Sequence, residues 1–479
     1  MRKHAFIPLA LLTLFAARCD CGGTLPNTPG DDGGSGVGGD GGMNNASSGG
    51  SGSGSSGGSS GSSGAGGDAG SFCEGSGPSV IIGSPDAGAI CGGDLAQITF
   101  RWGLCICEDM ALASVLETDA FDSAAGPYTQ GTIGGAVGVN GTYRNLAVSD
   151  INGSLFTGVD LRPIGDHDFR GEVHVGGAAV AAGDIHVFHD TWVTEEIRGI
   201  RWVIDGDLHI PAGATVSAAV DAQSVVNEPV NVAPPCGCEE SEIIDIASII
   251  ASRRTDNDNE VIGLTPDAWE SLTAEVDLTL PCGRYYVTGI GAAAAVTLHA
   301  TGRTALYVDG DIRLAGVLEV ELETPEAEMD IFVAGNIVAA GILRFGSSER
   351  PARVRTYVAG TEDILLAGDL DFGGNLYAPR ARVMAAGPME IFGSIFARSM
   401  VEAGLVTVHY DKAVLVAGNS CGTADSPDGG PGIPSGSCQS CTDCLNQACV
   451  GGTCGACTDS SECCAPLVCE EGRCISIPG

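Results

Sequence analysis

The sequence predicts a mainly β protein whose body is a right-handed parallel β-helix, or β-solenoid. The first observation is a repeated unit. RWVIDGDLHIPAG (201–213) and TALYVDGDIRLAG (304–316) share an aliphatic run, an Asp-Gly-Asp, a second short aliphatic run and a closing Gly. Apolar side chains alternate within each unit, which is typical of short strands with one buried face. Aromatic residues make up only 5% of the chain, so the core has to be built from Val, Ile, Leu and Ala.

Looser copies of the unit extend from residue 172 to residue 418, and most of them end in Ala-Gly. Gly adopts the positive φ of tight corners at little cost, so each unit predicts a strand, a corner and another strand. Repetition favours successive passes of the chain that bury their apolar faces on one another. An isolated copy also fits a hairpin, because Asp-Gly is a common hairpin turn. A β-sandwich or a meander of hairpins therefore stays open as the alternative fold.

Changes in composition divide the chain into segments. We expect a signal peptide at 1–18, a disordered Gly/Ser-rich tether at 19–71, a first solenoid half at 72–233, a short helical insert with flanking cysteines at 234–282, a second solenoid half at 283–420, a linker at 421–437 and a small disulfide-rich module at 438–479. The tether has almost no large apolar side chains. It therefore cannot bury enough surface to offset the entropy of ordering.

The N-terminus predicts export. Basic residues 2–4 precede an apolar run at 5–17, which is too short to span a bilayer and fits a signal-peptide core. We expect lipidation at Cys19, which would attach the protein to the membrane, although Arg18 stands where lipoprotein signals carry a small residue. The expected location is the outer membrane or cell surface. Without the lipid, the protein would be extracellular.

The helical insert is predicted from two amphipathic segments. Isoleucines between 243 and 250 recur at helical spacing, and Arg253 and Arg254 follow at the expected C-terminus. The second segment, TPDAWESLTAEV (265–276), begins with Thr265 as an N-cap and Pro266 in the first turn.

The cysteines predict disulfides rather than metal sites, because the expected compartment is oxidising and the C-terminal module contains no histidine. That module is too short to build an apolar core without cross-links. The pairing cannot be read from the sequence. The disulfide candidates are Cys73, Cys91, Cys105, Cys107, Cys236, Cys238, Cys282, Cys421, Cys438, Cys441, Cys444, Cys449, Cys454, Cys457, Cys463, Cys464, Cys469 and Cys474.

The net charge of −37 argues against a nucleic-acid partner, because binding phosphates requires basic patches. No cofactor is expected, with Ca²⁺ as the one alternative. Asp205, Asp207, Asp309 and Asp311 lie in the predicted corners and are its candidate ligands. Such carboxylates also favour tight turns without any metal. No catalytic residue is assigned, since the sequence carries no G-x-S-x-G, H-E-x-x-H or P-loop motif.

Residues 282–418 resemble an uncharacterised domain family of bacterial surface proteins, some of them linked to pilus assembly. The resemblance rests on PCGRYYV, ALYVDGD, DIFVAGN, GNLYAPRARV, IFGSIFA and VTVHYD. It implies a β-solenoid without assigned catalytic residues. With the tether and the cysteine-rich end, the chain is similar to exported proteins of myxobacteria.

The run CTDSSECCAPLVCEEGRC, from Cys457 to Cys474, resembles the small cysteine-rich module of Dickkopf-type proteins. The resemblance covers under a tenth of the chain and implies a disulfide-bonded module that often mediates protein contacts.

Together these observations predict an exported, lipid-anchored, non-catalytic protein with a structural or adhesive role. Its expected partners are the membrane, through the lipid, and surface proteins or glycans. The oligomeric state is not predicted. A secreted polysaccharide lyase or hydrolase is one alternative, because extracellular β-helices often cleave acidic polysaccharides with clustered Asp, Arg or Lys. A solenoid scaffold that assembles through uncapped ends is another.

Overall fold

The fold is taken from a computed structural model of the chain. It describes residues 72–73, 79–81, 89–91, 95–339, 342–366, 370–385, 387–402, 404–416, 438, 441–444, 447–470 and 473–475. The predicted signal peptide, the lipidation candidate Cys19, the whole predicted tether at 19–71, and the predicted linker at 421–437 with Cys421 lie outside these ranges.

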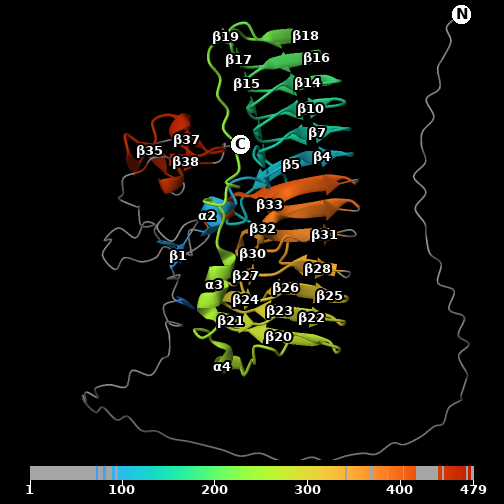
Figure 1. The fold of residues 1–479 in the computed structure, drawn as a ribbon, viewed down its shortest axis with the longest axis vertical. Helices are drawn as coiled ribbons and strands as arrows, with labels where there is room; N and C mark the ends of the chain where they lie inside the picture. The colour runs from blue at the N-terminus through green and yellow to red at the C-terminus, as the bar shows by residue number, and fades with distance from the viewer. Residues whose placement is uncertain are drawn as a thin grey trace, which may run out of the picture. The chain divides into compact units, whose positions relative to one another are not determined.

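The described body is mainly β and consists of short strands that pair in parallel (Figure 1). The chain first forms a set of strands that we call the first stack. It comprises β3 (Leu104–Ile106), β4 (Met110–Leu112), β5 (Leu116–Phe121), β6 (Val137–Val139), β7 (Tyr143–Asn145), β8 (Ser149–Ile151), β9 (Leu155–Thr157), β10 (Leu161–Pro163), β11 (His167–Phe169), β12 (Val173–Val175), β13 (Ala179–Val180), β14 (Asp184–Val187), β15 (Thr191–Val193), β16 (Glu196–Ile204), β17 (Leu208–Ile210), β18 (Thr215–Ala222) and β19 (Val225–Asn227).

A second stack follows the region of the predicted helical insert. It comprises β20 (Val276–Leu280), β21 (Gly283–Val287), β22 (Ile290–Ala292), β23 (Val296–Ala300), β24 (Arg303–Val308), β25 (Ile312–Leu314), β26 (Val317–Leu322), β27 (Glu328–Val333), β28 (Ile337–Ala339), β29 (Ile342–Phe345), β30 (Val354–Val358), β31 (Ile364–Leu366), β32 (Leu370–Ala385), β33 (Met389–Glu402) and β34 (Val406–Asp411).

The register shows why the short strands are stable. Leu161 pairs with Tyr143, and Val173 pairs with Leu155, so equivalent residues recur 18 positions along the chain. Alternate side chains of β12 point inward and are fully buried, as are those of β9 and β15 at the same positions. Each three-residue strand therefore gains its stability from the strands above and below it rather than from its own length.

The two stacks join into one, although the chain does not build them from end to end. β3 and β4 at the start of the first stack pair with β33, and β5 pairs with β34, the last strand of the second stack. The chain thus starts in the middle, proceeds to β19 at one end, returns along the outside and builds the second stack from the other end back to the middle (Figure 1).

The α-helices whose bounds the structure describes are short: α2 (Leu95–Thr99), α3 (Ile246–Arg253) and α4 (Asn259–Ile262). The first predicted helix of the insert is confirmed as α3. Its N-cap is Asp245, and Ile246 and Ile250 are buried. The second, at 265–276, is wrong, because this segment forms turns and runs into β20. Trp269 in these turns is only 4% exposed and packs on the end of the second stack. Packing there overrides the weak helical pattern.

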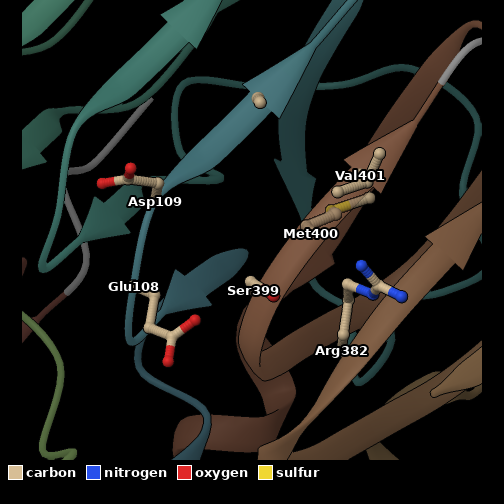
Figure 2. Close-up of a pocket in the computed structure, with 7 residues that line it drawn as sticks. Glu108, Asp109, Arg382, Ser399, Met400 and Val401 are labelled. Atoms are coloured by element: carbon tan, nitrogen blue, oxygen red, sulfur yellow. The ribbon is translucent and has the colours of Figure 1, made fainter.

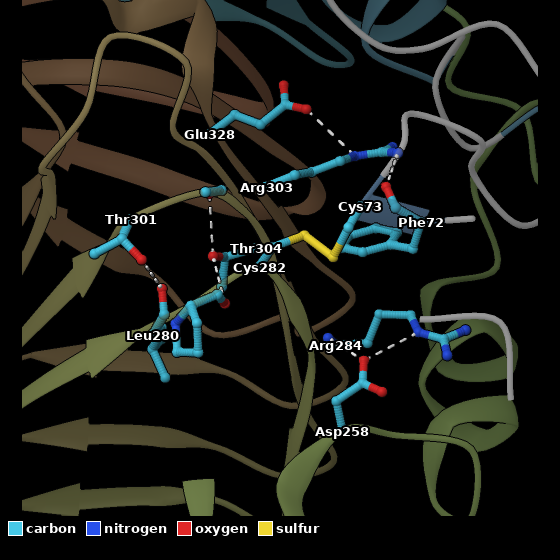
Figure 3. Close-up of a disulfide and its surroundings, with 12 residues drawn as sticks. Phe72, Cys73, Asp258, Leu280, Cys282, Arg284, Thr301, Arg303, Thr304 and Glu328 are labelled. Atoms are coloured by element: carbon cyan, nitrogen blue, oxygen red, sulfur yellow. Dashed lines mark hydrogen bonds and ion pairs between the residues drawn. A yellow bond between two sulfur atoms is a disulfide. The ribbon is translucent and has the colours of Figure 1, made fainter. Parts of the chain in front are cut away.

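Disulfides fasten the returning chain to the stacks. Cys105–Cys236 and Cys107–Cys238 join the β3 region to the return segment across 131 residues each, and Cys73–Cys282 joins the N-terminal segment to the second stack across 209 residues. Figure 3 shows Arg303 near the last of these bonds. Its guanidinium lies 4.4 Å from the Phe72 ring centroid, donates to the Phe72 carbonyl and pairs with Glu328.

The C-terminal module is cross-linked throughout its described part. Its described strands form two antiparallel hairpins, β35 (Ala448–Val450) with β36 (Thr453–Gly455) and β37 (Val468–Glu470) with β38 (Arg473–Ile475), and two short 3-10 helices, η5 (Cys441–Cys444) and η6 (Ser460–Glu462), accompany them. The disulfides are Cys438–Cys449, Cys441–Cys464, Cys444–Cys454, Cys457–Cys469 and Cys463–Cys474. The prediction that these cysteines form disulfides is confirmed. Cys91 ends β2 (Ala89–Cys91), which pairs with β1 (Ser79–Ile81).

Candidate binding face

A single line of outward-facing residues runs along one side of both stacks, and we call it the outward column. In the order given by the parallel register, it consists of Tyr286, Tyr307, Phe332, Tyr357, Tyr377, Phe396, Cys105, Gly138, Phe156, His174, Trp192 and His209. Strands in a sheet lie about 4.8 Å apart, which lets flat rings on adjacent strands stack. Most members of the column are accordingly aromatic.

In the second stack the outward column is buried. Helix α3 packs against β21, β24 and β27, and the exposures of Tyr307 and Tyr357 fall to 2% and 1%. Ile244, just before the helix, donates its backbone N–H to the Tyr377 hydroxyl at 3.3 Å. Burial raises the pKa of Tyr357 and of Tyr377, so both hydroxyls stay protonated. This half of the column is a docking surface for the chain's own return segment.

In the first stack the column is only half-buried. Phe156, His174, Trp192 and His209, which we call the aromatic ladder, stack with centroid separations of 4.0, 4.2 and 4.7 Å and interplanar angles of 11°, 8° and 10°. The side chains of His174 and His209 are 18% and 16% exposed. Burial is thus less complete than under α3, and the stacked rings present a continuous row of ring edges along the stack.

Carboxylates fix the two imidazoles of the aromatic ladder. The Nε2 atom of His174 lies 3.0 Å from the Glu172 carboxylate, and the Nδ1 atom of His209 lies 2.7 Å from that of Glu228. Each contact holds its ring against rotation and places an acceptor at the ring edge. The ladder therefore combines apolar ring edges with hydrogen-bonding groups, which is the combination that binding sites for polar ligands use.

The return segment passes beside this ladder as an extended strap, residues 228–235. From Asn227 to Cys236 there are nine residue steps, which span about 30 Å at about 3.3 Å each. From β19 to β3 there are six strand spacings, or about 29 Å at about 4.8 Å each. The strap must therefore run almost straight along the stack. Its residues 229–235 make no hydrogen bond to the described residues, so its polar anchors lie at its ends, and only side chains such as those of Val230 and Val232 are partly buried between them.

A shallow cavity lies where the two stacks meet (Figure 2). It has a volume of about 450 Å³ and is lined by Glu108, Asp109, Ala111, Arg382, Ser399, Met400 and Val401. Figure 2 shows the two carboxylates on the opposite side from Arg382. Asp109 accepts the backbone N–H of Thr142 at 2.8 Å, and Arg382 pairs with Asp363. Asp109 and Arg382 are thus engaged in contacts within the stacks, which makes them less suited to acid–base chemistry.

The four aspartates proposed for Ca²⁺ are distributed between the two stacks and do not meet at one site. Asp309 accepts from Arg254 and from the Tyr286 hydroxyl, which fastens the end of α3. Asp311 accepts the backbone N–H of Asn336 at 2.7 Å, one strand further along the stack. Arg254 and Asn336, each by its hydrogen bond, hold the pKa of their aspartate below its usual value.

The two aspartates of the first stack have similar partners. Asp205 lies 3.0 Å from His186 Nε2, and Asp207 accepts from the Ser224 hydroxyl at 2.7 Å. The Gly between the members of each pair is needed for packing. A Cβ on Gly310 would lie 2.5 Å from the Thr288 carbonyl oxygen of the neighbouring strand. The Asp-Gly-Asp corners thus hold adjacent layers together.

His299 is the centre of the most metal-like cluster outside the cysteines in the described part of the chain. Its Nδ1 atom lies 2.6 Å from Glu323 and 3.1 Å from Glu321, and its Nε2 atom lies 2.8 Å from Asp277. Burial lowers the pKa of His299, but the Glu323 hydrogen bond and the surrounding carboxylates outweigh that effect and raise it. A protonated His299 donates from both nitrogens, and this accounts for the cluster as an ion-paired one.

Comparison with known proteins identifies one family. A model described as a domain of unknown function (DUF7305) matches residues 239–415, which include α3, α4 and the second stack. This match begins upstream of the resemblance that starts at residue 282. No curated protein and no solved structure matches the chain. None of the helices in the described part of the chain has the length and apolar composition needed to span a bilayer.

The aromatic ladder was not predicted, although the sequence contains its signal. Phe156, His174 and Trp192 are spaced 18 residues apart, which is the strand register of the first stack. The repeated Gly corners mark where the chain bends, and they do not indicate which side chains face outward.

Proposed function

We propose that this chain is an exported, non-catalytic structural and adhesive protein of the cell surface, anchored through a lipid on Cys19. In this proposal the joined stacks form a right-handed β-solenoid, which serves as a rod. The parallel register, the recurrence every 18 residues in the first stack and the inward aliphatic side chains support that finer description.

The aromatic ladder is the observation that carries the adhesive role. Four stacked rings cover one another's faces and present a row of ring edges along the rod, and carboxylates of Glu172 and Glu228 lie beside them as acceptors. Sugars offer C–H groups that can pack along such apolar edges and hydroxyl donors for such carboxylates. Because the chain carries a net charge of −37, polyanions are repelled. The ligand class that fits is a neutral glycan chain lying along the stack.

The alternative of a polysaccharide lyase or hydrolase requires convergent acids and bases that are free to react. In the junction cavity, Asp109 and Arg382 are already engaged by Thr142 and Asp363. Ca²⁺ binding by the corner aspartates has equally little support, because each of them has a protein partner.

The test is a fluorescence titration of the full chain with cellohexaose and chitohexaose. We expect one of these to perturb the emission of Trp192. The Trp192→Ala variant, followed by calorimetry, should weaken binding about tenfold or more, since an aromatic contact and its burial contribute more than about 1.4 kcal/mol. Leu146→Ala is the matched control, because Leu146 is 56% exposed and lies outside the ladder.

Two outcomes count against this proposal. If neither oligosaccharide binds, or if Trp192→Ala and Leu146→Ala bind equally, the ladder is not a glycan site. If chain-shortened products accumulate during the titration, the enzyme alternative is favoured instead. Protease treatment of intact cells, with mass analysis of the N-terminus, tests the surface location and the lipid separately.

A further inference from the structure

The end of the first stack formed by β18 and β19 is open. β18 pairs only with β16, and β19 pairs only with β17, among the strands that the structure describes. The outer edge of both strands therefore offers unpaired backbone N–H and C=O groups. Such an edge is a template for pairing with another strand.

The inward side chains at this end are exposed to solvent. Val216 and Val225 continue the inward lines of Ile197 and Leu208, one strand below. Ile197 and Leu208 are fully buried, whereas Val216 is 44% and Val225 50% exposed. The valines are placed as core residues, but no further strand covers them. The hydrophobic core is therefore exposed to solvent at this end of the first stack.

The opposite end of the joined stack is closed by the chain itself. Residues 264–272 cross it, with Trp269 buried and Leu264 and Leu272 packed on the core. Carbonyl groups of this segment accept from the strand region below: Pro266 from the Thr288 N–H at 2.8 Å, and Trp269 from the Gly291 N–H at 2.8 Å. The apolar core and the edges of β21 and β22 are thus covered there. Among the described strands β20 pairs only with β23, but exposed Asp277 places a charge on that edge, which disfavours pairing.

The open end differs from the rest of the surface in charge. Residues 215–227 contain one charged side chain, Asp221, in a chain with a net charge of −37. Edge strands usually carry charged residues or Pro that block pairing, and this edge lacks Pro and has that single charge. Two copies of the chain repel each other through most of their surface but can approach closely at this end.

The remaining segments of the chain are poor covers for it. The region 22–71 is Gly, Ser, Asn and Asp with almost no large apolar side chain, and 417–437 is rich in Gly, Pro and Ser. Neither has the β-branched and aliphatic residues that a covering strand would need. A second copy supplies the missing groups, because its own open end carries the same valines and the same unpaired edge.

We propose that the β18–β19 end docks on the same end of a second copy of this chain. A two-fold axis across the stack gives an isologous contact, in which Val216 and Val225 of each copy meet the apolar end of the other. Because residues 264–272 cover the core at the second-stack end and the remaining edge strand β20 carries Asp277, association stops at a dimer and does not continue into a filament. This inference is independent of glycan binding by the aromatic ladder.

The test measures the mass of the full chain in solution by sedimentation equilibrium over a range of concentrations. We expect a monomer–dimer equilibrium between the 48.3 kDa chain and twice that mass. Val216→Lys with Val225→Lys should weaken the dimer at least a hundredfold, since four ammonium groups would be buried without partners. Both residues are exposed in the monomer, so the monomer fold should be kept, as circular dichroism would show.

The matched control is Leu146→Lys with Val159→Lys, which adds the same charges at residues 56% and 47% exposed away from the open end. The control pair should dimerise like the unmodified chain. A monomer at every concentration, or a dimer that the Val216→Lys, Val225→Lys pair leaves unchanged, would overturn the proposal. So would open-ended growth beyond two chains, because it would require the closed end to associate as well.

Discussion

The two stacks share one outward column of side chains but use it differently. In the second stack, α3 and the residues before it cover the column, and Tyr307 and Tyr357 are almost completely buried. In the first stack, an extended strap without hydrogen bonds along residues 229–235 passes the same column, and the rings stay half-buried. Aromatic side chains are needed in one half to bind the chain itself. In the other half, the same pattern stays partly exposed, and it is there that we propose a ligand binds.

The return segment causes this difference, because it is extended before the disulfides at Cys236 and Cys238 and forms α3 after them. Before Cys236, the return segment is stretched to nearly its full length between β19 and β3, so these residues cannot form a helix. Beyond Cys238 the span no longer limits it, and Ile246 and Ile250 can face the column from one side of α3. Chain length therefore decides which half of the column is covered.

The largest effect should come from removing the disulfides Cys105–Cys236 and Cys107–Cys238, which lie between the extended strap and the helical part of the return segment. We expect Cys105→Ala, Cys107→Ala, Cys236→Ala and Cys238→Ala together to lower the free energy of unfolding by about 4 to 5 kcal/mol. The reason is that the loops closed by these bonds span 131 residues. Urea unfolding followed by circular dichroism measures it.

The control for removing these two disulfides is Cys457→Ala with Cys469→Ala in the C-terminal module, where the bond spans only 12 residues. The urea midpoint of the stacks should not change in that variant. If the four-alanine variant also unfolds at the unmodified midpoint, the return segment is held by packing alone and the strap is not under constraint.

A smaller effect should separate the covered part of the column from the half-buried part. Phe332 is 7% exposed under α3 and stacks 4.8 Å from Tyr357, whereas Phe156 belongs to the aromatic ladder. Phe332→Ala should cost about 3 to 5 kcal/mol, and Phe156→Ala less than half of that, since a half-buried ring leaves little cavity. Urea unfolding of the two variants gives the difference. Equal losses would mean that the strap covers the ladder as fully as α3 covers its half.

Much of the body could be predicted from the sequence because its pattern is local. Alternating aliphatic residues, Gly corners and α3 with its acidic N-cap are decided by residues close in the chain, and the corner glycine Gly310 is indeed in contact with the adjacent strand. The helix expected at 265–276 was wrong, because Trp269 gains more by packing on the end of the stack. That gain depends on a surface made by distant residues.

The candidate site was harder to predict, because it depends on how the stacks join. Nothing local indicates that β3 continues β33, or that Cys105 falls between two aromatic series in one column. The aspartates chosen as metal ligands have the right chemistry, but their partners lie about one strand away in the stack or on α3. Register and topology therefore had to be known before the ladder and the open end could be recognised.

The smallest predicted effect is the pH dependence of the junction between the stacks. His409 in β34 is 6% exposed. Its Nδ1 lies 2.7 Å from Asp119 of the first stack, and its Nε2 lies 3.1 Å from Glu390. Burial lowers the pKa of His409, but the hydrogen bonds and charges of Asp119 and Glu390 outweigh that and raise it above its ordinary value.

A raised folded-state pKa means that the folded protein holds this proton more tightly than the unfolded chain does. The stabilisation is therefore complete below the unfolded pKa of about 6.5, and it is lost as pH rises through the folded pKa. We expect the urea midpoint to fall over that window. His409→Asn should make the step smaller, and the raised pKa of His299 accounts for a remaining part, which His299→Asn removes separately. If His409→Asn leaves the step as large as in the unmodified chain, the charge of His409 does not help to hold the two stacks together.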